Sequence, residues 1–221
     1  MPVSEYEQTV KRVNLGYDFL LTLTFCVLRG LHLPNLDLLV VGAGGGAEIE
    51  QFLPDNPGWR LTGVDPSHDM LALAAAKIER LGVRERVRLV HGTVDDLPPQ
   101  TRFDAATCLF VLHFLPDEQK LELLQGIAEH LQPSAPLIVA SGTRVDDGGL
   151  RDDLLGTWQH YGELMGMPPE RMTATIEQLM EQQPTMASED TYAQLLGQAG
   201  FSLVAKLFSV LGGGLTAWIA R

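Results

Sequence analysis

The chain has 221 residues, of which 45% are apolar, and a formal net charge of −12 at pH 7. This length and composition are typical of one globular α/β domain that buries a full hydrophobic core. An acidic protein repels phosphate groups at long range, which disfavours nucleic acid as a partner. The two cysteines, Cys26 and Cys108, both lie in apolar runs, so we expect no disulfide framework and a cytoplasmic location.

The most apolar stretch is 15–33. It contains an aspartate, an arginine and a histidine, and its uninterrupted uncharged part, 19–28, is far shorter than the ~20 residues needed to span a bilayer. It also lacks the basic start and the small-residue cleavage site of a signal peptide. We therefore expect a helical cap within residues 1–35 and no membrane association.

From residue 36 onward, short apolar runs alternate with helical patterns, which is typical of βαβ units and a parallel sheet. The continuously apolar run 38–41 ends in glycines, as expected for a central strand covered on both faces. The other strands of this part are predicted at 60–64, 87–90, 103–109 and 137–141, and its helices at 47–52, 67–81 and 117–131.

The pattern changes between residues 145 and 190, where ten acidic residues and two arginines accompany helix-like segments at 152–165 and 170–181. We expect this insert to be a helical lid over the substrate. A helix at 189–199 and strands at 201–210 and 215–220 follow, and the glycine link 212–214 is too short for a parallel crossover. The predicted fold is one α/β domain, 1–221, with a three-layer αβα Rossmann-like sheet of seven strands. The sheet is mostly parallel, with an antiparallel last strand.

A glycine run, Gly42-Ala43-Gly44-Gly45-Gly46, links the first predicted strand to a helix. Such a loop presents backbone N–H groups at the helix N-terminus, and side chains would collide with a ligand lying on it. The run fits G-x-G-x-G, and it fits the dinucleotide form G-x-G-x-x-A equally well. Alone, it indicates a nucleoside-containing ligand without saying which one.

Two further loops end at the same predicted edge of the sheet. Asp65 follows the second strand, 23 residues after Gly42, where a carboxylate can accept hydrogen bonds from both ribose hydroxyls. The alternative role for Asp65 is to cap the next helix. The loop 92–98 follows the third strand, and its polar groups would either contact an adenine or form a solvated acidic turn.

Together these loops resemble class I S-adenosylmethionine-dependent methyltransferases. The matching motifs are VVGAGGGAE, GVDPSHDML and HGTVDDLPP, followed by FDAATCLFVLHFLPD and LQPSAPLIVA. The C-terminal stretches AGFSLVAKLF and GLTAWIAR resemble the closing strands of the family, so that the resemblance covers roughly two thirds of the chain.

The resemblance implies S-adenosylmethionine as the cofactor and a site for each part of it. The methionine and sulfonium would lie near Gly42, Ala43 and Gly44, and the ribose at Asp65, with Pro66 also in the cofactor site. Ser67 to Met70 would flank the adenine, Thr93 and Val94 would contact its edge, and Phe110 would lie near the cofactor. Two positions depart from the family pattern. Family members often carry an acid where this chain has Val40, and Asp or Asn where it has Thr93.

The N-terminal run RVNLGYDFLLTLT resembles a bacterial subgroup that includes carboxy-S-adenosylmethionine synthase. In that subgroup a helix closes over the cofactor, which would place Tyr17 nearest the methionine end. The resemblance therefore adds a cofactor-modifying activity to the functions to consider. Arg144 and Arg151 could favour it if one of them lay near the cofactor.

Methyl transfer is an in-line displacement at an already activated carbon, so the protein mainly aligns the reactants and excludes water. A general base is needed only when the nucleophile must lose a proton. His113, just after the fourth strand, is the candidate base, and packing under the next loop is its alternative role. Trp158 and Tyr161 share a helix face that serves either core packing or substrate stacking. No histidine spacing predicts a metal site.

The sequence leaves several functions open. The preferred one is methyl transfer to a small molecule, which the acidic insert suggests to be neutral or cationic. An NAD-dependent oxidoreductase, a carboxy-S-adenosylmethionine synthase-like enzyme and a non-catalytic S-adenosylmethionine-binding protein are the alternatives, and a homodimer stays open.

Overall fold

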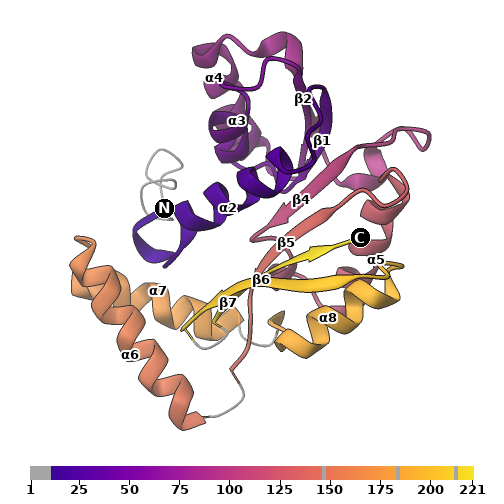
Figure 1. The fold of residues 1–221 in the computed structure, drawn as a ribbon. Helices are drawn as coiled ribbons and strands as arrows, with labels where there is room; N and C mark the ends of the chain where they lie inside the picture. Colours follow the sequence, from indigo (N-terminus) through magenta and orange to yellow (C-terminus); the bar gives the residue numbers. More distant parts are fainter. Residues whose placement is uncertain (1–10, 146–147, 183–184, 212–213) are drawn as a thin grey trace.

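The structure is a computed structural model that describes residues 11–145, 148–182, 185–211 and 214–221 (Figure 1). Its centre is a seven-stranded sheet in the order β3-β2-β1-β4-β5-β7-β6. The strands are β1 (Leu36–Val41), β2 (Trp59–Asp65), β3 (Val87–His91), β4 (Ala105–Leu109), β5 (Leu137–Gly142), β6 (Val204–Val210) and β7 (Leu215–Ala220).

Seven described α-helices and three short 3₁₀ turns connect these strands. The α-helices are α2 (Tyr17–Arg29), α3 (Ala47–Phe52), α4 (His68–Leu81), α5 (Asp117–Glu129), α6 (Gly148–Leu164), α7 (Pro169–Gln182) and α8 (Glu189–Gln198). The 3₁₀ turns are η1 (Arg84–Arg86), η2 (Val94–Asp96) and η3 (Leu112–Phe114). Within the described ranges, no helix is both long enough and apolar enough to cross a membrane.

The first five strands run parallel, whereas β7 lies antiparallel between β5 and β6. The predicted mostly parallel sheet with an antiparallel last strand is therefore confirmed. Of the glycine link predicted to force this arrangement, Gly212 and Gly213 lie outside the described residues.

Both faces of the sheet are covered, which explains the continuous apolar run of β1. Leu38 and Val40 point into a core shared with α2, α3 and α4. Leu39 and Val41 point the opposite way, into a core shared with α5 and α8. This alternation follows from the two-residue period of a strand, and it confirms the three-layer αβα architecture.

Two predicted strand starts are wrong because their first residues use their N–H groups elsewhere. Phe103 donates to the carbonyl of His130 and makes only an isolated bridge with Leu131, so β4 begins at Ala105. Phe201 donates to the carbonyl of Leu196 and so closes the end of α8, and β6 begins only at Val204.

Tyr192 fastens α8 to the end of β5. Its side chain is fully buried, and its hydroxyl accepts a hydrogen bond from Ser141 Oγ at 2.8 Å and donates to the carbonyl of Gly142 at 3.2 Å. Burial raises the pKa of Tyr192 to about 12, so the hydroxyl keeps its proton. Because strands of this class end at the ligand-binding edge, this contact fixes one rim of the site described below.

We expect Tyr192→Phe to lower the free energy of unfolding by about 1–3 kcal/mol, because the substitution removes the buried hydroxyl that joins Ser141 Oγ to the carbonyl of Gly142. Urea denaturation measures this difference. Tyr161→Phe, at a half-exposed position of α6, is the matched control and should change the value by less than about 0.5 kcal/mol. Equal effects of the two substitutions would contradict the role assigned to Tyr192.

Candidate cofactor and substrate site

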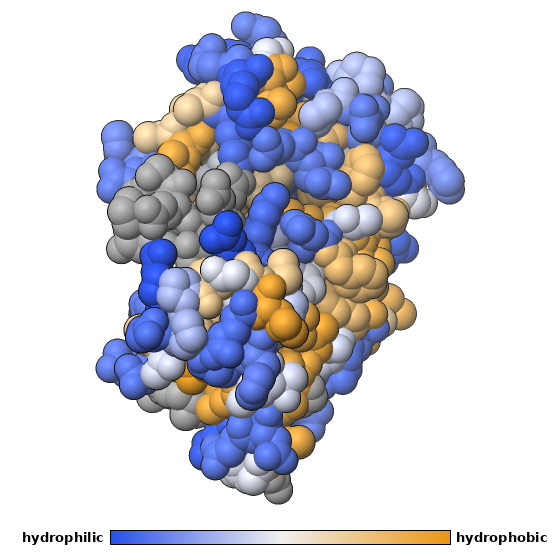
Figure 2. Space-filling view, turned by 90° about the vertical axis from the view of Figure 1, so that its left-hand side faces the viewer, coloured by the Kyte–Doolittle hydropathy of each residue, from blue (hydrophilic) through white to orange (hydrophobic). Residues whose placement is uncertain are grey.

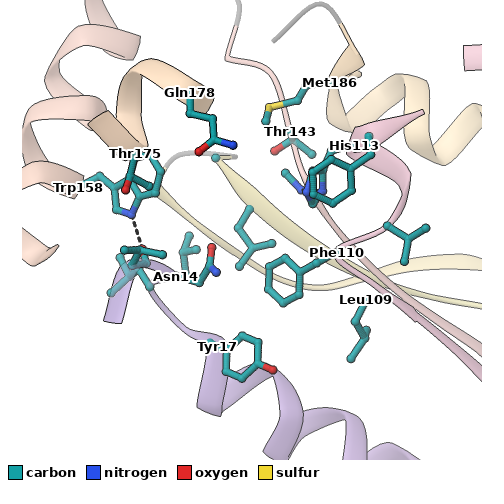
Figure 3. Close-up of a pocket in the computed structure, with 18 of the residues that line it drawn as sticks. Asn14, Tyr17, Leu109, Phe110, His113, Thr143, Trp158, Thr175, Gln178 and Met186 are labelled. Carbon is teal, nitrogen blue, oxygen red and sulfur yellow. Dashed lines mark hydrogen bonds between the residues drawn. The ribbon is translucent and has the colours of Figure 1, made fainter. Parts of the chain in front are cut away.

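A cavity of about 840 Å³ opens at the carboxyl edge of the sheet. Its inner wall consists of the segments that follow β1, β2, β4 and β5, and its outer walls are α2, α6 and α7. Figure 3 shows side chains from these distant parts of the chain facing one another across it, with Tyr17 on α2, Phe110 after β4, and Trp158 and Gln178 on the insert. A volume of roughly 300–1,000 Å³ is typical of small-molecule sites.

The glycine run forms the tightest part of the wall. Gly42 has a φ of +72°, and a Cβ at this position would come within 2.3 Å of Val111 Cγ2. Gly46 has a φ of +79°, and a Cβ there would meet the backbone of Ala74 at 3.2 Å. Only glycine fits both the backbone conformation and the space. The loop therefore packs closely, and Gly42, Ala43 and Gly44 line the cavity as predicted.

Asp65 ties this loop to the next helix. Its Oδ2 accepts from the N–H of Gly44 and its Oδ1 accepts from the N–H of Ser67, both at 2.8 Å. The cap of α4 is Ser67, whose Oγ accepts from the N–H of Met70. A carboxylate has about four acceptor positions, so Asp65 keeps capacity for ligand hydroxyls at the cavity wall, which it lines together with Pro66 and Met70.

Thr93 and Val94, which the resemblance assigned to the edge of the adenine, are not among the described residues that line the cavity. Thr93 Oγ1 accepts from the N–H of Asp95 and caps η2, and the side chain of Asp96 accepts from the N–H of Thr93. Val94 is 2% exposed, and a Cβ on Gly126 of α5 would come within 2.8 Å of it. The loop folds back onto α5, so these two side chains are used within the protein.

Phe110 and Tyr17 form an aromatic pair across the cavity. Their rings stack with centroids 5.6 Å apart and an angle of 23° between the planes. Phe110 adopts a φ of +60°, which is rare for a bulky residue and costs about 1–3 kcal/mol. This conformation directs the ring into the cavity, where it meets the helix α2 that was expected to close over the cofactor.

His113 lines the cavity, but its geometry differs from that of the predicted base. Its Nδ1 accepts a hydrogen bond from the N–H of Gly142 at 3.2 Å. Because a backbone N–H can only donate, the proton of the neutral ring must be on Nε2. Burial, and to a smaller extent the charge of Lys120, lowers the pKa of His113 to about 4. The observed ring is thus a neutral hydrogen-bond donor.

The insert is anchored to the segment before α2. Trp158 donates from Nε1 to the carbonyl of Val13, and both side chains pack with Met167 and Met172 in a small core of their own. Tyr161 packs against the same core. Trp158 also lines the cavity, so core packing is observed for this side chain and substrate stacking stays a prediction.

Charge is distributed unevenly over the insert. Figure 2 shows mostly hydrophilic side chains over this side of the molecule, with apolar atoms grouped in its middle and along one edge. The acidic residues of α6 and α7 are all exposed, namely Asp152, Asp153, Glu163, Glu170, Glu177 and Glu181. By contrast, both arginines of the insert, Arg151 and Arg171, line the cavity. The expectation of a neutral or cationic acceptor was drawn from the insert as a whole, whereas the described charged side chains of the insert that line the cavity are these two arginines, of which Arg171 is also exposed.

Sequence reasoning missed Glu48, a cavity residue that is only 6% exposed. It is the second residue of α3, where an acid ordinarily sits in solvent and favours the helix N-terminus. Nothing in the local pattern indicates that this carboxylate is buried, because its burial depends on how α3 lies against β4.

The comparisons with known proteins agree with this geometry. Residues 39–137 match the methyltransferase domain family. A carboxy-S-adenosyl-L-methionine synthase of Aeromonas salmonicida is 23% identical over 90% of this chain and 81% of its own length. Magnesium protoporphyrin IX methyltransferase from Synechocystis, solved with bound SAH, superposes with a TM-score of 0.68 at 16% identity, over 98% of this chain and 92% of that one.

The chain therefore has the fold of class I S-adenosylmethionine-dependent methyltransferases, its residues 39–137 are similar to their methyltransferase domain, and its cofactor is S-adenosylmethionine, as the resemblance predicted. Coverage of other relatives is partial. An uncharacterized protein of Synechococcus sp. is 31% identical over 51% of this chain but only 27% of its own length. The chain spans about half the length of several structural neighbours.

We expect Asp65→Asn to weaken the binding of S-adenosylhomocysteine at least tenfold, because the amide replaces one acceptor oxygen with a donor that faces backbone N–H groups. Isothermal titration calorimetry measures the affinity, and NADH in the same assay should bind far more weakly. Asp69→Asn, an exposed change in the first turn of α4, should leave the affinity within twofold. Tighter binding of NADH would contradict the cofactor assignment.

We expect the His113 environment to make the protein sensitive to acid. The unfolded chain binds a proton near the ordinary pKa of 6.5, while the folded ring stays neutral down to about 4. Stability is therefore unaffected above pH 6.5 and falls, by up to about 3 kcal/mol, as the pH drops to 4.

Urea denaturation measures the free energy of unfolding at each pH. The fall between pH 6.5 and pH 4 should be smaller by this amount in His113→Gln, whereas His160→Gln, on the exposed side of α6, should show the same fall as wild type. Nitrogen-15 NMR should place the ring proton on Nε2. A proton on Nδ1 would contradict the assignment.

Proposed function

We propose that the chain transfers the methyl group of S-adenosylmethionine to a small-molecule acceptor held between the cofactor and the insert. The observation that carries this proposal is one continuous cavity, which extends from the glycine loop and Asp65 to the side chains of α6 and α7. A cofactor on the loop and an acceptor against the insert would share this space. Enclosure by α2 and the insert would keep water from the reacting atoms.

The residues at the cofactor end would bind and orient, which is most of what this displacement needs. Gly42 and Gly44 provide close backbone approach, Asp65 accepts from hydroxyls, and the pair Tyr17 and Phe110 covers the cofactor from the side of α2. When bound, S-adenosylmethionine supplies the activated methyl carbon. The protein then contributes alignment, and the acceptor supplies the nucleophile.

The acceptor end favours an apolar molecule with an anionic or hydrogen-bond-accepting group. Leu154, Leu155 and Trp158 provide apolar walls. Arg151 contributes a guanidinium whose buried Nε makes no hydrogen bond among the described residues and has only a loose ion-pair contact with Asp152 Oδ1, at 3.9 Å. A buried donor without a partner is costly, so a ligand acceptor atom at this place would stabilise the complex.

His113 fits this proposal as a group that orients the acceptor. A neutral ring with its proton on Nε2 can donate a hydrogen bond to an acceptor oxygen or nitrogen, and its Nδ1 lone pair is occupied by Gly142. Removal of a proton from the nucleophile would then fall to solvent or to the acceptor's own groups. We therefore propose that His113 positions the acceptor, in place of the general-base role expected from the sequence.

A second candidate function is modification of the cofactor itself. It is favoured by the similarity to the Aeromonas salmonicida carboxy-S-adenosyl-L-methionine synthase, which extends over 90% of this chain, and by Arg151 in the cavity. An arginine could pair with a carboxylate on the cofactor. Native mass spectrometry of the purified protein would detect such a carboxylated cofactor and so separate the two candidates.

To test methyl transfer, we would measure S-adenosylhomocysteine release with matched sets of anionic, neutral and cationic aromatic acceptors. The anionic set should give the highest kcat/KM. Arg151→Met should raise the KM for the best acceptor about tenfold or more, because the substitution removes a charge-assisted hydrogen bond. The KM for S-adenosylmethionine should stay unchanged. Arg60→Met, at an exposed position of β2, is the control. A preference for cationic acceptors, or no turnover with any set, would contradict the proposal.

A further inference from the structure

Glu48 is a buried acid in the wall of the cavity, next to the glycine loop. It is 6% exposed, and the other residues that line this end of the cavity include Gly42, Gly44 and Tyr17. The hydroxyl of Thr107 on β4 donates a long hydrogen bond of 3.4 Å to Oε1 of this carboxylate. The methyltransferase fold explains the glycine loop 42–46, but it does not explain why the carboxylate of Glu48 is buried next to this loop.

The sheet register fixes where this carboxylate lies. Val40 of β1 is paired with Thr107 of β4, so their side chains point to the same face of the sheet. Since Glu48 contacts Thr107, its carboxylate lies over that face, at the level of the Val40–Thr107 pair, and it lines the same cavity as Gly42 and Gly44. At this level β1 carries the apolar Val40, and the acid Glu48 comes from the first turn of α3.

No salt bridge within the described residues reaches Glu48. The cation with the largest effect on it is Lys77 of α4, whose Nζ lies 3.1 Å from a different acid, Glu50. On β4, burial raises the pKa of the Cys108 thiol to about 12, so that this neighbour is uncharged. Asp65 is the other acid on this cavity wall, and its oxygens are held by Gly44 and Ser67.

A buried carboxylate in such surroundings resists ionisation. Burial raises the pKa of Glu48 to about 7, although its own backbone N–H, Thr107 and Lys77 act in the opposite direction. At neutral pH the acid is therefore about half protonated when the cavity holds no ligand. A cation that arrives next to it would shift this balance toward the charged form.

S-adenosylmethionine carries two cations, the sulfonium and the ammonium of its methionine part. We propose that Glu48 is a cofactor-binding residue whose carboxylate pairs with a positive charge of bound S-adenosylmethionine and loses its proton as the cofactor binds. The inference rests on the cofactor assignment and is independent of the acceptor. It makes cofactor affinity depend on pH in the neutral range.

The test is calorimetric titration of S-adenosylmethionine and S-adenosylhomocysteine between pH 6 and 8, in two buffers that differ in ionisation enthalpy. For a site that binds only the charged form of a group with a pKa of about 7, affinity rises about tenfold over this range, and about half a proton is released per ligand at pH 7. Glu48→Gln should abolish both effects and weaken binding at pH 8 at least tenfold. Titration of the ligand's own amino group is common to both proteins and cancels in the comparison.

Glu118→Gln is the control, because this acid is exposed on α5 and does not line the cavity. It should keep the wild-type pH dependence. Folding of Glu48→Gln is checked by urea denaturation. The raised pKa of Glu48 means that its stabilising contribution is complete below pH 4.5 and is lost as the pH rises through 7, so the glutamine variant should be at least as stable as wild type at pH 8.

The two ligands identify the charge that is bound. An effect on both ligands assigns Glu48 to the ammonium, and an effect on S-adenosylmethionine alone assigns it to the sulfonium. Wild-type binding that neither releases protons nor changes with pH, or a Glu48→Gln variant with wild-type affinity at pH 8, overturns the inference and leaves the cofactor assignment standing. Failure of wild type to bind either ligand overturns both.

Discussion

The carboxylate of Asp65 holds the cofactor end of the site together. One oxygen accepts from Gly44 and the other from Ser67, so the end of β2 is fastened to the loop after β1 and to the start of α4. The contact is possible only because β1 and β2 are parallel neighbours whose carboxyl ends meet at one edge. It also orders the donors of the glycine loop before a ligand arrives, which reduces the entropic cost of binding.

The acceptor end depends on contacts between parts of the chain that are far apart in sequence. Trp158 of the insert donates to the carbonyl of Val13, which precedes α2, while Tyr192 fastens the helix after the insert to the end of β5. In Figure 1 the insert helices α6 and α7 lie at the edge of the sheet, apart from the layers that cover its faces. This placement leaves their inner sides free to form a wall of the cavity.

The negative net charge of this protein reflects its exposed surface and does not describe the charges that line the cavity. The formal charge is −12, yet the acids of α6 and α7 are exposed while Arg151 and Arg171 line the cavity. At the opposite end, Glu48 and Asp65 stand beside the glycine loop. The acids beside the glycine loop and the arginines on the insert support the proposed pairing of a cationic cofactor with an acceptor that carries negative charge.

The sequence by itself determined the strand and helix order, the antiparallel last strand, the glycine loop and Asp65, because these follow from short-range periodicity and from fixed spacing. Only the tertiary structure decided which side chains reach the cavity. Val94 is buried against α5, His113 has its Nδ1 occupied by Gly142, and Glu48 is enclosed under the loop. Each of these depends on how one element packs against another, and burial, which sets the pKa of a side chain and its access to ligand, is a property of that packing.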